Sequence, residues 1–254
     1  MGRIIAISNP QGGLGKTVTA VNLSISIARR GYNVLLIDAD AQGNSSHYLG
    51  IEGEGLENTT YELITGKSPV DRCLRHSTVE NLSVVPANSD LAAAEIELIN
   101  MVGHEYALKA EIEKVKDDYD YIFIDCPSSL SLLTINAMAS ADGLIIPIQC
   151  VPYAVELLER FLKAIERVKE QFNPKMHIEG IIFILLESDS SVCNEVLIAD
   201  AKTRLRERVF DTMIPHSIEI VKGSSEGKTA FDYDPESAGA KSYDRLADEI
   251  IKNL

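Results

Sequence analysis

The chain lacks any hydrophobic run long enough to cross a membrane. None approaches the roughly 20 consecutive apolar residues that a spanning helix needs. Residues 1–3 lead directly into an apolar segment, without the charged and then apolar pattern of a signal peptide. Gly2 is not followed by the Ser or Thr that a myristoylation signal requires. We therefore expect a cytoplasmic protein without a membrane partner.

Cysteine is scarce, and its spacing is not that of a metal site or a disulfide framework. The four cysteines lie far apart: Cys73, Cys126, Cys150 and Cys193. We predict that they are reduced and mostly buried, as is usual for cytoplasmic proteins. An iron–sulfur role for Cys126 is rejected, because no second cysteine stands at a companion position.

Positive charge is also in short supply, since 24 Lys and Arg face 38 Asp and Glu, for a net charge of −14. Proteins that coat phosphate backbones usually carry a basic surplus, at least locally. The acidic balance therefore lowers the expectation of DNA binding without excluding a basic patch. Lys202, Arg204, Arg206 and Arg208 form one basic run, and a solvated helix face is slightly favoured over a DNA contact for it.

Repeats, low-complexity tracts and linkers are absent, so residues 1–254 are expected to form a single domain. Short apolar runs with little polar alternation are typical of strands buried on both faces. These predicted strands are Arg3–Ser8, Asn33–Asp38, Leu82–Pro86, Tyr121–Asp125, Gly143–Ile148, Ile178–Leu185 and Val209–Ile214. The predicted helices are Lys16–Arg30, Leu91–Lys116, Leu130–Ser140, Tyr153–Gln171, Ser191–Glu207 and Ser237–Asn253.

This alternation predicts an α/β fold: one doubly wound, mostly parallel sheet with helices on both faces. Ligands of such sheets bind at the carboxyl ends of the strands. The loop Gly50–Asn58 is expected to be exposed and mobile, and a plain surface loop is favoured over a segment that orders on ligand binding. Near the C-terminus, Leu246, Ile250, Ile251 and Leu254 form a helical stripe that favours core packing over a membrane anchor.

A glycine-rich turn between a strand and a helix is the most informative feature that the chain does contain. Residues 4–17 read Ile-Ile-Ala-Ile-Ser-Asn-Pro-Gln-Gly-Gly-Leu-Gly-Lys-Thr. In such a turn, backbone N–H groups crowd around phosphate oxygens and the helix N-terminus adds its positive dipole end. Lys16 is expected on the outer phosphates of a nucleoside triphosphate, and the Thr17 hydroxyl on Mg²⁺. The predicted nucleotide-binding residues here are Gln11, Gly12, Gly13, Leu14, Gly15, Lys16, Thr17 and Val18.

Two apolar segments end in carboxylates at the places where a phosphate site needs them. Residues 34–37 lead into Asp38 and Asp40, which would order magnesium-bound water, position the attacking water, or merely cap the turn. Residues 121–124 lead into Asp125, which has the position of a Walker B acid and would accept a hydrogen bond from magnesium-bound water or from Thr17. These motifs argue against a plain strand–helix turn at residues 9–15.

Together the motifs resemble the ParA/Soj family of deviant Walker A ATPases, within the wider MinD-like group. The resemblance covers nearly the whole chain and includes Asp38–Asn44, Asp120–Leu130 and Ile214–Thr229. It implies an ATP- and Mg²⁺-dependent switch in which ATP-bound monomers pair face to face. The dimer of such proteins binds a surface, commonly nonspecific DNA, and a ParB-like or other partner triggers hydrolysis. By position, the resemblance implies catalytic roles for Lys16 and Asp40, metal roles for Thr17 and Asp125, and an adenine contact at Pro215.

Three departures from the family pattern bear on activity. The signature lysine, which in the family crosses the dimer interface to the partner's phosphates, is replaced by Gln11. Arginines that chromosome-partitioning members use against DNA are missing around 187–192 and 214–219, which weakens the expectation of nonspecific DNA binding. Val18 follows Thr17 where a second Thr is usual, and this should weaken nucleotide binding modestly.

Two hypotheses about the function of the chain stay open at this point. The first is an ATPase switch that partitions or positions DNA or another cargo, either free in the cytoplasm or on the nucleoid. The second is a nucleotide-binding regulatory scaffold with little turnover, motivated by Gln11 and the absent arginines. A small-molecule enzyme of the same superfamily, such as dethiobiotin synthetase, fits on fold alone and is disfavoured by the motifs at Asp38–Asn44 and Asp125–Ser129.

Overall fold

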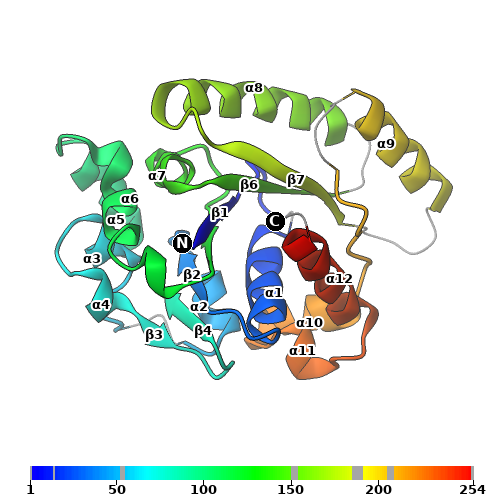
Figure 1. Cartoon of the computed structure of the whole chain (residues 1–254), viewed down its shortest axis with the longest axis horizontal. Coiled ribbons are helices and arrows are strands. Elements are labelled where there is room, and N and C mark those ends of the chain that lie inside the picture. The colour runs from blue at the N-terminus through cyan, green and yellow to red at the C-terminus, as the bar shows by residue number, and fades with distance from the viewer. Residues whose placement is uncertain are drawn as a thin grey trace.

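The computed structural model describes residues 2–13, 15–51, 55–149, 154–184, 191–204 and 209–252. Its centre is a seven-stranded sheet with the order β3-β4-β2-β5-β1-β6-β7 (Figure 1). The strands are β1 (Arg3–Ile7), β2 (Val34–Asp38), β3 (Arg75–His76), β4 (Leu82–Val85), β5 (Tyr121–Asp125), β6 (Gly143–Gln149) and β7 (His177–Ile184). All neighbouring pairs are parallel except β3 with β4.

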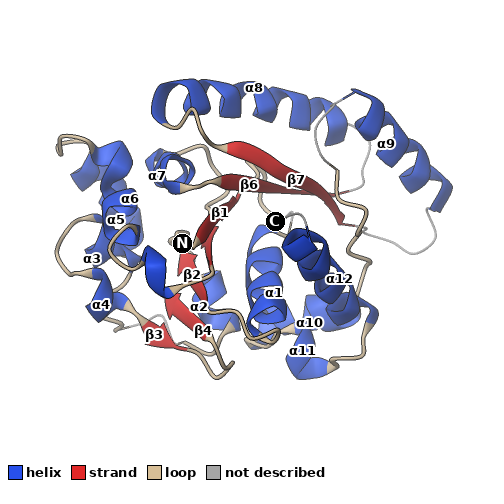
Figure 2. Ribbon diagram, viewed as in Figure 1, coloured by secondary structure: helices blue, strands red, loops and turns tan. Residues whose placement is uncertain are grey.

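Helices cover both faces of this sheet, which confirms the predicted doubly wound α/β class (Figure 2). The helices before β5 are α1 (Lys16–Ala28), α2 (Asn44–Tyr48), α3 (Thr60–Ile64), α4 (Val70–Cys73), α5 (Leu91–Leu98), η1 (His104–Tyr106), α6 (Ala107–Ile112) and η2 (Lys116–Asp118). Those after β5 are α7 (Leu132–Ser140), α8 (Ala154–Phe172), α9 (Ser191–Arg204), α10 (Ile218–Glu226), α11 (Ala230–Tyr233) and α12 (Ala238–Lys252).

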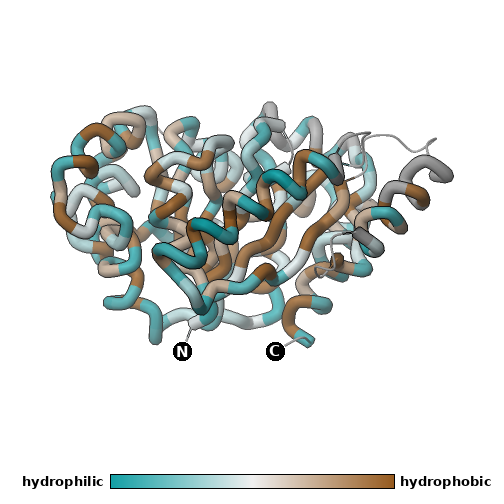
Figure 3. The backbone as a smooth tube through the Cα atoms, turned by 90° about the horizontal axis from the view of Figure 1, so that it is seen from above, coloured by the Kyte–Doolittle hydropathy of each residue, from teal (hydrophilic) through white to brown (hydrophobic). Residues whose placement is uncertain are grey.

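The strands are buried on both faces because alternate residues of each strand enter two different cores. In β1, Ile4 and Ala6 belong to the core under α5 to α8, whereas Ile5 and Ile7 belong to the core under α1 and α12. Figure 3 shows hydrophobic segments running through the middle of the molecule, with hydrophilic segments on the helices around them. Continuous apolar runs in the sequence therefore correspond to central strands.

Two predicted elements are wrong. Val209–Ile214 is no strand: it makes only two isolated bridges, Ile181 with Val209 and Ile184 with Ile214. Between these bridges the backbone N–H groups of Asp211 and Thr212 donate to the Glu249 carboxylate of α12, at 2.8 and 3.1 Å. A side chain from another element thus takes the hydrogen bonds that would have extended a ladder.

The single helix predicted over Leu91–Lys116 is also wrong. The structure divides this segment into α5, η1 and α6, and the following η2 begins at Lys116. Gly103 between α5 and η1 has φ of 73°, in the left-handed region where a helix cannot continue. One amphipathic stretch therefore becomes several short helices that turn around the edge of the sheet.

The C-terminal stripe packs in the core, as predicted. Leu246 and Ile250 of α12 are fully buried together with residues of α1, while Leu254 lies outside the described residues. Arg30, just after α1, strengthens this contact by ion pairs with Asp244 at 2.9 Å and Asp248 at 2.8 Å. Within the part of the chain that the structure describes, no helix is both long and apolar enough to span a bilayer.

The predictions for cysteines and for the Gly50–Asn58 loop are tested only in part. Cys73 and Cys126 are buried and free, as predicted, whereas Cys150 and the Cys193 side chain lie outside the described residues. In the loop, residues 52–54 lie outside the described residues as well. Its far end is anchored rather than loose, because the backbone oxygen of Glu57 accepts a hydrogen bond from Arg75 at 2.8 Å.

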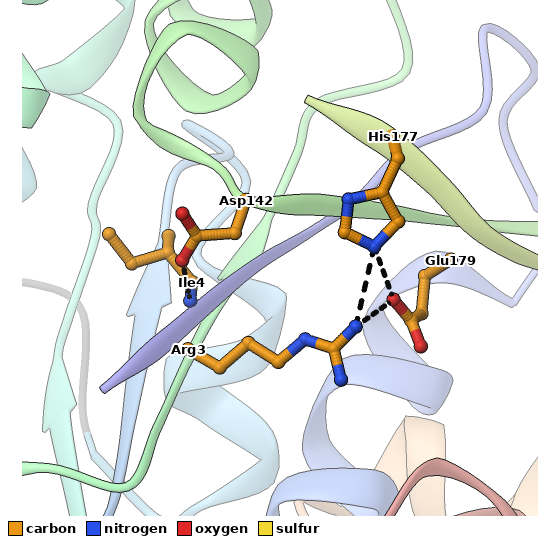
Figure 4. Close-up of polar contacts among 5 residues, drawn as sticks. All are labelled: Arg3, Ile4, Asp142, His177 and Glu179. Atoms are coloured by element: carbon orange, nitrogen blue, oxygen red, sulfur yellow. Dashed lines mark hydrogen bonds and ion pairs between the residues drawn. The ribbon is translucent and has the colours of Figure 1, made fainter. Parts of the chain in front are cut away.

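A buried carboxylate ties the beginning of β1 to the edge strand β7 (Figure 4). Glu179 is 2% exposed; it forms an ion pair with Arg3 and lies 2.9 Å from Nε2 of His177. On the other side of the strand, the Ile4 backbone N–H donates to Asp142 at 2.9 Å. These contacts fix the amino ends of β1, β6 and β7, at the edge of the sheet opposite the strand ends that bear Asp38 and Asp125.

Replacing Glu179 by Ala is expected to lower the free energy of unfolding by about 3 kcal/mol, because Arg3 would lose its buried counter-charge. Urea denaturation followed by circular dichroism measures this change. Asp248→Ala is the matched control, since it removes an ion pair from the protein surface and should cost less than about 1 kcal/mol. Equal effects of the two substitutions would contradict a special role for the Arg3–Glu179 pair.

Candidate nucleotide site

The glycine-rich turn joins the carboxyl end of β1 to the start of α1. Gly13 and Gly15 have φ of 73° and 75°, which only glycine adopts without strain. A Cβ on Gly15 would lie 2.3 Å from Cδ1 of Ile184. Gly15 is the N-cap of α1 and offers no side-chain cap, so the N–H groups of the first helical turn are available for an anion.

Two side-chain amides that are not among the predicted nucleotide-binding residues shape this turn. The buried Asn9 side chain donates to the Pro147 backbone oxygen at 2.7 Å and accepts from the Gln11 backbone N–H at 3.0 Å. Gln149, at the carboxyl end of β6, donates to the Gly13 backbone oxygen at 3.0 Å. The turn is therefore fixed against β6 before any ligand binds.

The Lys16 ammonium group lies inside the turn. Its Nζ donates to the Gln11 backbone oxygen at 2.8 Å and to Oγ of Ser128 at 3.0 Å. Burial lowers the Lys16 pKa, and the negative charges of Asp125 and Asp40 oppose that shift. Both contacts of the ammonium are neutral oxygens, which an incoming phosphate oxygen can replace with a stronger charge-assisted hydrogen bond.

Two fully buried carboxylates lie side by side at the strand ends, because Asp38 of β2 pairs in register with Asp125 of β5. Asp38 accepts hydrogen bonds from the Ser46 backbone N–H at 2.9 Å and the Ser46 hydroxyl at 2.7 Å. Burial raises the pKa of both carboxyls, and for Asp125 the charge of Asp38 raises it further. Such a pair is stabilised by added positive charge.

One of the two carboxylate oxygens of Asp125 has no hydrogen-bond donor. Its Oδ2 accepts from the Ser45 hydroxyl at 2.7 Å, whereas the buried Oδ1 meets no donor at normal hydrogen-bond geometry. The Thr17 hydroxyl is close enough to lower the Asp125 pKa. Mg²⁺ typically uses one or two carboxylates, directly or through water, together with substrate phosphates, so the residues present fit this ion. Among the described residues, no group of three or more His, Cys, Asp and Glu side chains is placed to hold a metal ion.

A cavity of about 450 Å³ opens beside the turn. Its lining includes the polar side chains of Lys16, Asp40 and Ser128 as well as less polar ones: Tyr48, Ile184, Ile214, Pro215 and Ile220. This volume is within the range of small-molecule sites. This mixed lining suits a ligand that has both charged and apolar groups.

The structure brings most of the predicted site residues to this cavity. Its lining includes Gly13, Gly15, Lys16, Thr17, Val18, Asp40 and Pro215. Gln11, Gly12 and Asp125 are not part of the lining, and Leu14 lies outside the described residues. Sequence reasoning missed Asn9, Ser46 and Gln149. The only signal was that each is a polar residue next to a motif or at the carboxyl end of an apolar run.

Gln11 borders a second hollow, of about 250 Å³, on the outer side of the turn. Leu130, Leu157 and Phe161 make this hollow apolar, and the first two are more than one-third exposed. The Gln11 side chain is itself exposed. Gln11, the predicted replacement of a signature lysine, therefore lies on an open, partly apolar face of the molecule.

Comparisons with known proteins agree with this geometry. Residues 2–178 match the family model described as AAA domain. The chain is 43% identical over 253 residues to sporulation initiation inhibitor protein Soj of Bacillus subtilis, covering 100% of both. It is 39% identical over 252 residues to chromosome partitioning protein ParA of Myxococcus xanthus, covering 99% of this chain and 89% of that protein. A solved structure of cobyrinic acid a,c-diamide synthase from Mycobacterium smegmatis, with bound ATP analog and magnesium, is also similar. Its TM-score is 0.88 and its sequence identity is 30%. The match covers 100% of this chain and 96% of that chain.

Proposed function

Because the chain belongs to the Soj and ParA family of P-loop ATPases, we propose that it is an ATP-dependent switch that partitions or positions DNA or another cargo. One observation carries the ATP part of the proposal. The Lys16 ammonium is buried in the turn on two replaceable neutral oxygens, beside the spare oxygen of Asp125. A triphosphate would replace the neutral oxygens around Lys16 with charged ones, and its Mg²⁺ would supply a partner for the Asp125 oxygen.

Each residue of the site has a role in this proposal. Backbone N–H groups of Gly12 to Gly15 and the start of α1 bind phosphate oxygens, and Lys16 binds the outer phosphates. Thr17 and Asp125 hold Mg²⁺, which neutralises charge on the phosphates. Asp40 orients the attacking water and supports hydrolysis. Pro215 lies against the adenine, and Val18 lies beside the inner phosphates without donating a hydrogen bond.

Titration calorimetry with ATP and Mg²⁺ tests the binding site directly. We expect heat that saturates at one ATP per chain, and weaker binding when EDTA removes the metal. Asp125→Asn should weaken the Mg²⁺-dependent part of the affinity and leave the metal-free part unchanged. Absence of any heat with folded protein would refute the proposed function.

We propose further that ATP brings two copies together across the face that bears Gln11. The exposed Gln11 side chain and the apolar hollow beside it, with Leu130 and Leu157 at its rim, support this choice of face. Sedimentation velocity should detect dimers with ATP and monomers with ADP. A single sedimentation coefficient under both conditions would remove the dimer from the proposal.

Asp40→Ala distinguishes an ATPase that hydrolyses ATP from a regulatory scaffold with little turnover, which is the second functional hypothesis. If the protein hydrolyses ATP, we expect the substitution to lower turnover by about 100-fold, the usual size of a general-base effect, and to leave ATP binding intact. Phosphate release measured with purified protein reports the rate. Asp90→Ala, which changes an exposed aspartate, is the control and should leave turnover unchanged. Phosphate release at background level from both the parent chain and Asp40→Ala would favour the regulatory scaffold.

The proposed place of action is the cytoplasm, on or near the nucleoid, with a ParB-like or other protein as activating partner. Direct DNA binding is expected to be weak. Lys202 of the basic run is engaged with Asp211 at 3.4 Å, and the Arg204 side chain and residues 205–208 lie outside the described residues. A small-molecule enzyme is disfavoured, because identity to Soj is 43%, against 30% to the structure named as a diamide synthase.

A further inference from the structure

A cluster of exposed apolar side chains lies on α5 and the turn that follows it, away from the nucleotide site. We define the α5 patch by five residues: Ile96, Ile99, Met101, Val102 and Tyr106. Ile96 is 72% exposed and Ile99 is 67% exposed. Single exposed apolar residues are common, but a contiguous group marks an interaction surface.

Helix α5 is apolar on two faces. Leu91, Ala94 and Leu98 form the inner stripe and are buried in the core. Ala92, Ile96 and Ile99 form an exposed outer stripe with i, i+4, i+7 spacing. A helix with a second apolar stripe of this spacing is built to pack against another helix. Within the described residues nothing covers the outer stripe, and Figure 1 shows α5 at the edge of the molecule.

The surroundings of the patch are acidic. From Asn88 to Tyr106 the chain has no Lys or Arg and four carboxylates, at Asp90, Glu95, Glu97 and Glu105. The neighbouring Lys67 pairs with Glu97 at 2.7 Å, which leaves the segment as a whole negative. Anionic lipid headgroups would be repelled, and a twofold contact between copies would bring like charges together. Charge complementarity therefore points to a cationic partner.

We propose that the α5 patch docks a basic amphipathic helix of a partner protein. Apolar side chains of that helix cover Ile96 and Ile99, and its Lys and Arg side chains face the surrounding carboxylates. The segment before α5 also contacts the nucleotide site, since the Ala87 backbone N–H donates to the Ser46 hydroxyl at 3.0 Å and that hydroxyl donates to Asp38. The proposal goes beyond the ATPase switch and does not depend on it.

A synthetic 18-residue helix of Leu and Lys, with Leu at i, i+3, i+4, i+7 spacing, is a suitable probe. Its binding to the full chain is measured by fluorescence anisotropy at low salt. We expect Ile96→Ser/Ile99→Ser to weaken binding by about tenfold, which corresponds to about 1.4 kcal/mol. Val196→Ser on α9 is the matched control, because Val196 is 64% exposed and lies outside the patch; its affinity should equal that of the parent chain.

A second peptide with Glu in place of Lys tests the charge argument and should bind about tenfold more weakly than the Lys peptide. Equal binding of the two peptides, or equal losses from the Val196 and Ile96/Ile99 variants, would overturn the proposal. Two other results would also overturn it. In the first, the Ile96/Ile99 variant keeps peptide binding but loses a dimer that the parent chain forms without nucleotide. In the second, the variant keeps peptide binding but loses binding to phosphatidylglycerol vesicles. ATP calorimetry on the same variant should match the parent chain, which separates failure here from failure of the ATP site.

Discussion

Replacing Gln11 by Lys is expected to raise ATP turnover about 100-fold and to strengthen the ATP-bound dimer. The resemblance to the family implies a lysine at position 11 that would reach the partner's phosphates in the proposed dimer, and glutamine cannot supply positive charge there. Arginine fingers in the same role contribute about 10³ to 10⁵ in rate. We expect a smaller gain, because the hollow beside Gln11 is lined by the apolar side chains of Leu130 and Leu157 and by Arg160, which do not favour an added positive charge.

The substitution should not disturb the fold. The Gln11 backbone is fixed by Asn9 and by Lys16, whereas its side chain is exposed. Phosphate release per chain should also rise with protein concentration in Gln11→Lys, because a lysine acting across an interface needs a second copy. Turnover assays over a range of protein concentrations measure both effects.

Two control variants separate charge at this position from other changes. Gln11→Met has a similar length without charge and should give no gain. Gln171→Lys adds the same charge at an exposed site on α8 and should leave turnover unchanged. If Gln11→Lys turns over ATP at the parent rate with no change in dimerisation, Gln11 does not lie at a nucleotide-bridged interface.

The core strands were predictable from sequence because their environment is the same on both faces. A continuous run such as Val34–Ile37 can be stable only between two apolar layers, and the structure buries every residue of it. The carboxylates that follow such runs were also predictable as neighbours, since parallel strands present their carboxyl ends at one edge of the sheet. Asp38 and Asp125 meet there in register.

The elements that sequence reasoning missed depend on partners far away in the chain. Val209–Ile214 is apolar enough for a strand, yet Glu249 of α12 takes its central N–H groups. The turn at the nucleotide site is likewise fixed by Gln149 and by the Asn9 contact with Pro147, across separations of more than 130 residues. The pattern of neighbouring residues in the sequence does not predict such contacts, because each of these polar side chains could equally well form its hydrogen bonds with water.

Replacing Lys16 by Met should weaken ATP binding by about 100-fold, which corresponds to about 3 kcal/mol. Methionine keeps most of the apolar stem of lysine and removes only the ammonium group. The Ser128 hydroxyl and the Gln11 backbone oxygen lose a donor. Ser128 lines the cavity and Gln11 is an exposed residue, so water can replace the lost donor. Calorimetry with ATP and Mg²⁺ measures the loss, and turnover should fall to background.

Lys16→Met should lower the affinity for ATP without lowering the stability of the fold. Burial lowers the pKa of Lys16, which means that the folded chain pays a desolvation cost to keep the ammonium there. Without nucleotide, the free energy of unfolding of Lys16→Met should therefore equal or exceed that of the parent chain, a pattern opposite to that of a structural lysine. Lys67→Met, at an exposed ion pair, should leave ATP affinity unchanged. A Lys16→Met variant that is strongly destabilised but binds ATP within about threefold of the parent would show that the ammonium stabilises the turn rather than the phosphates.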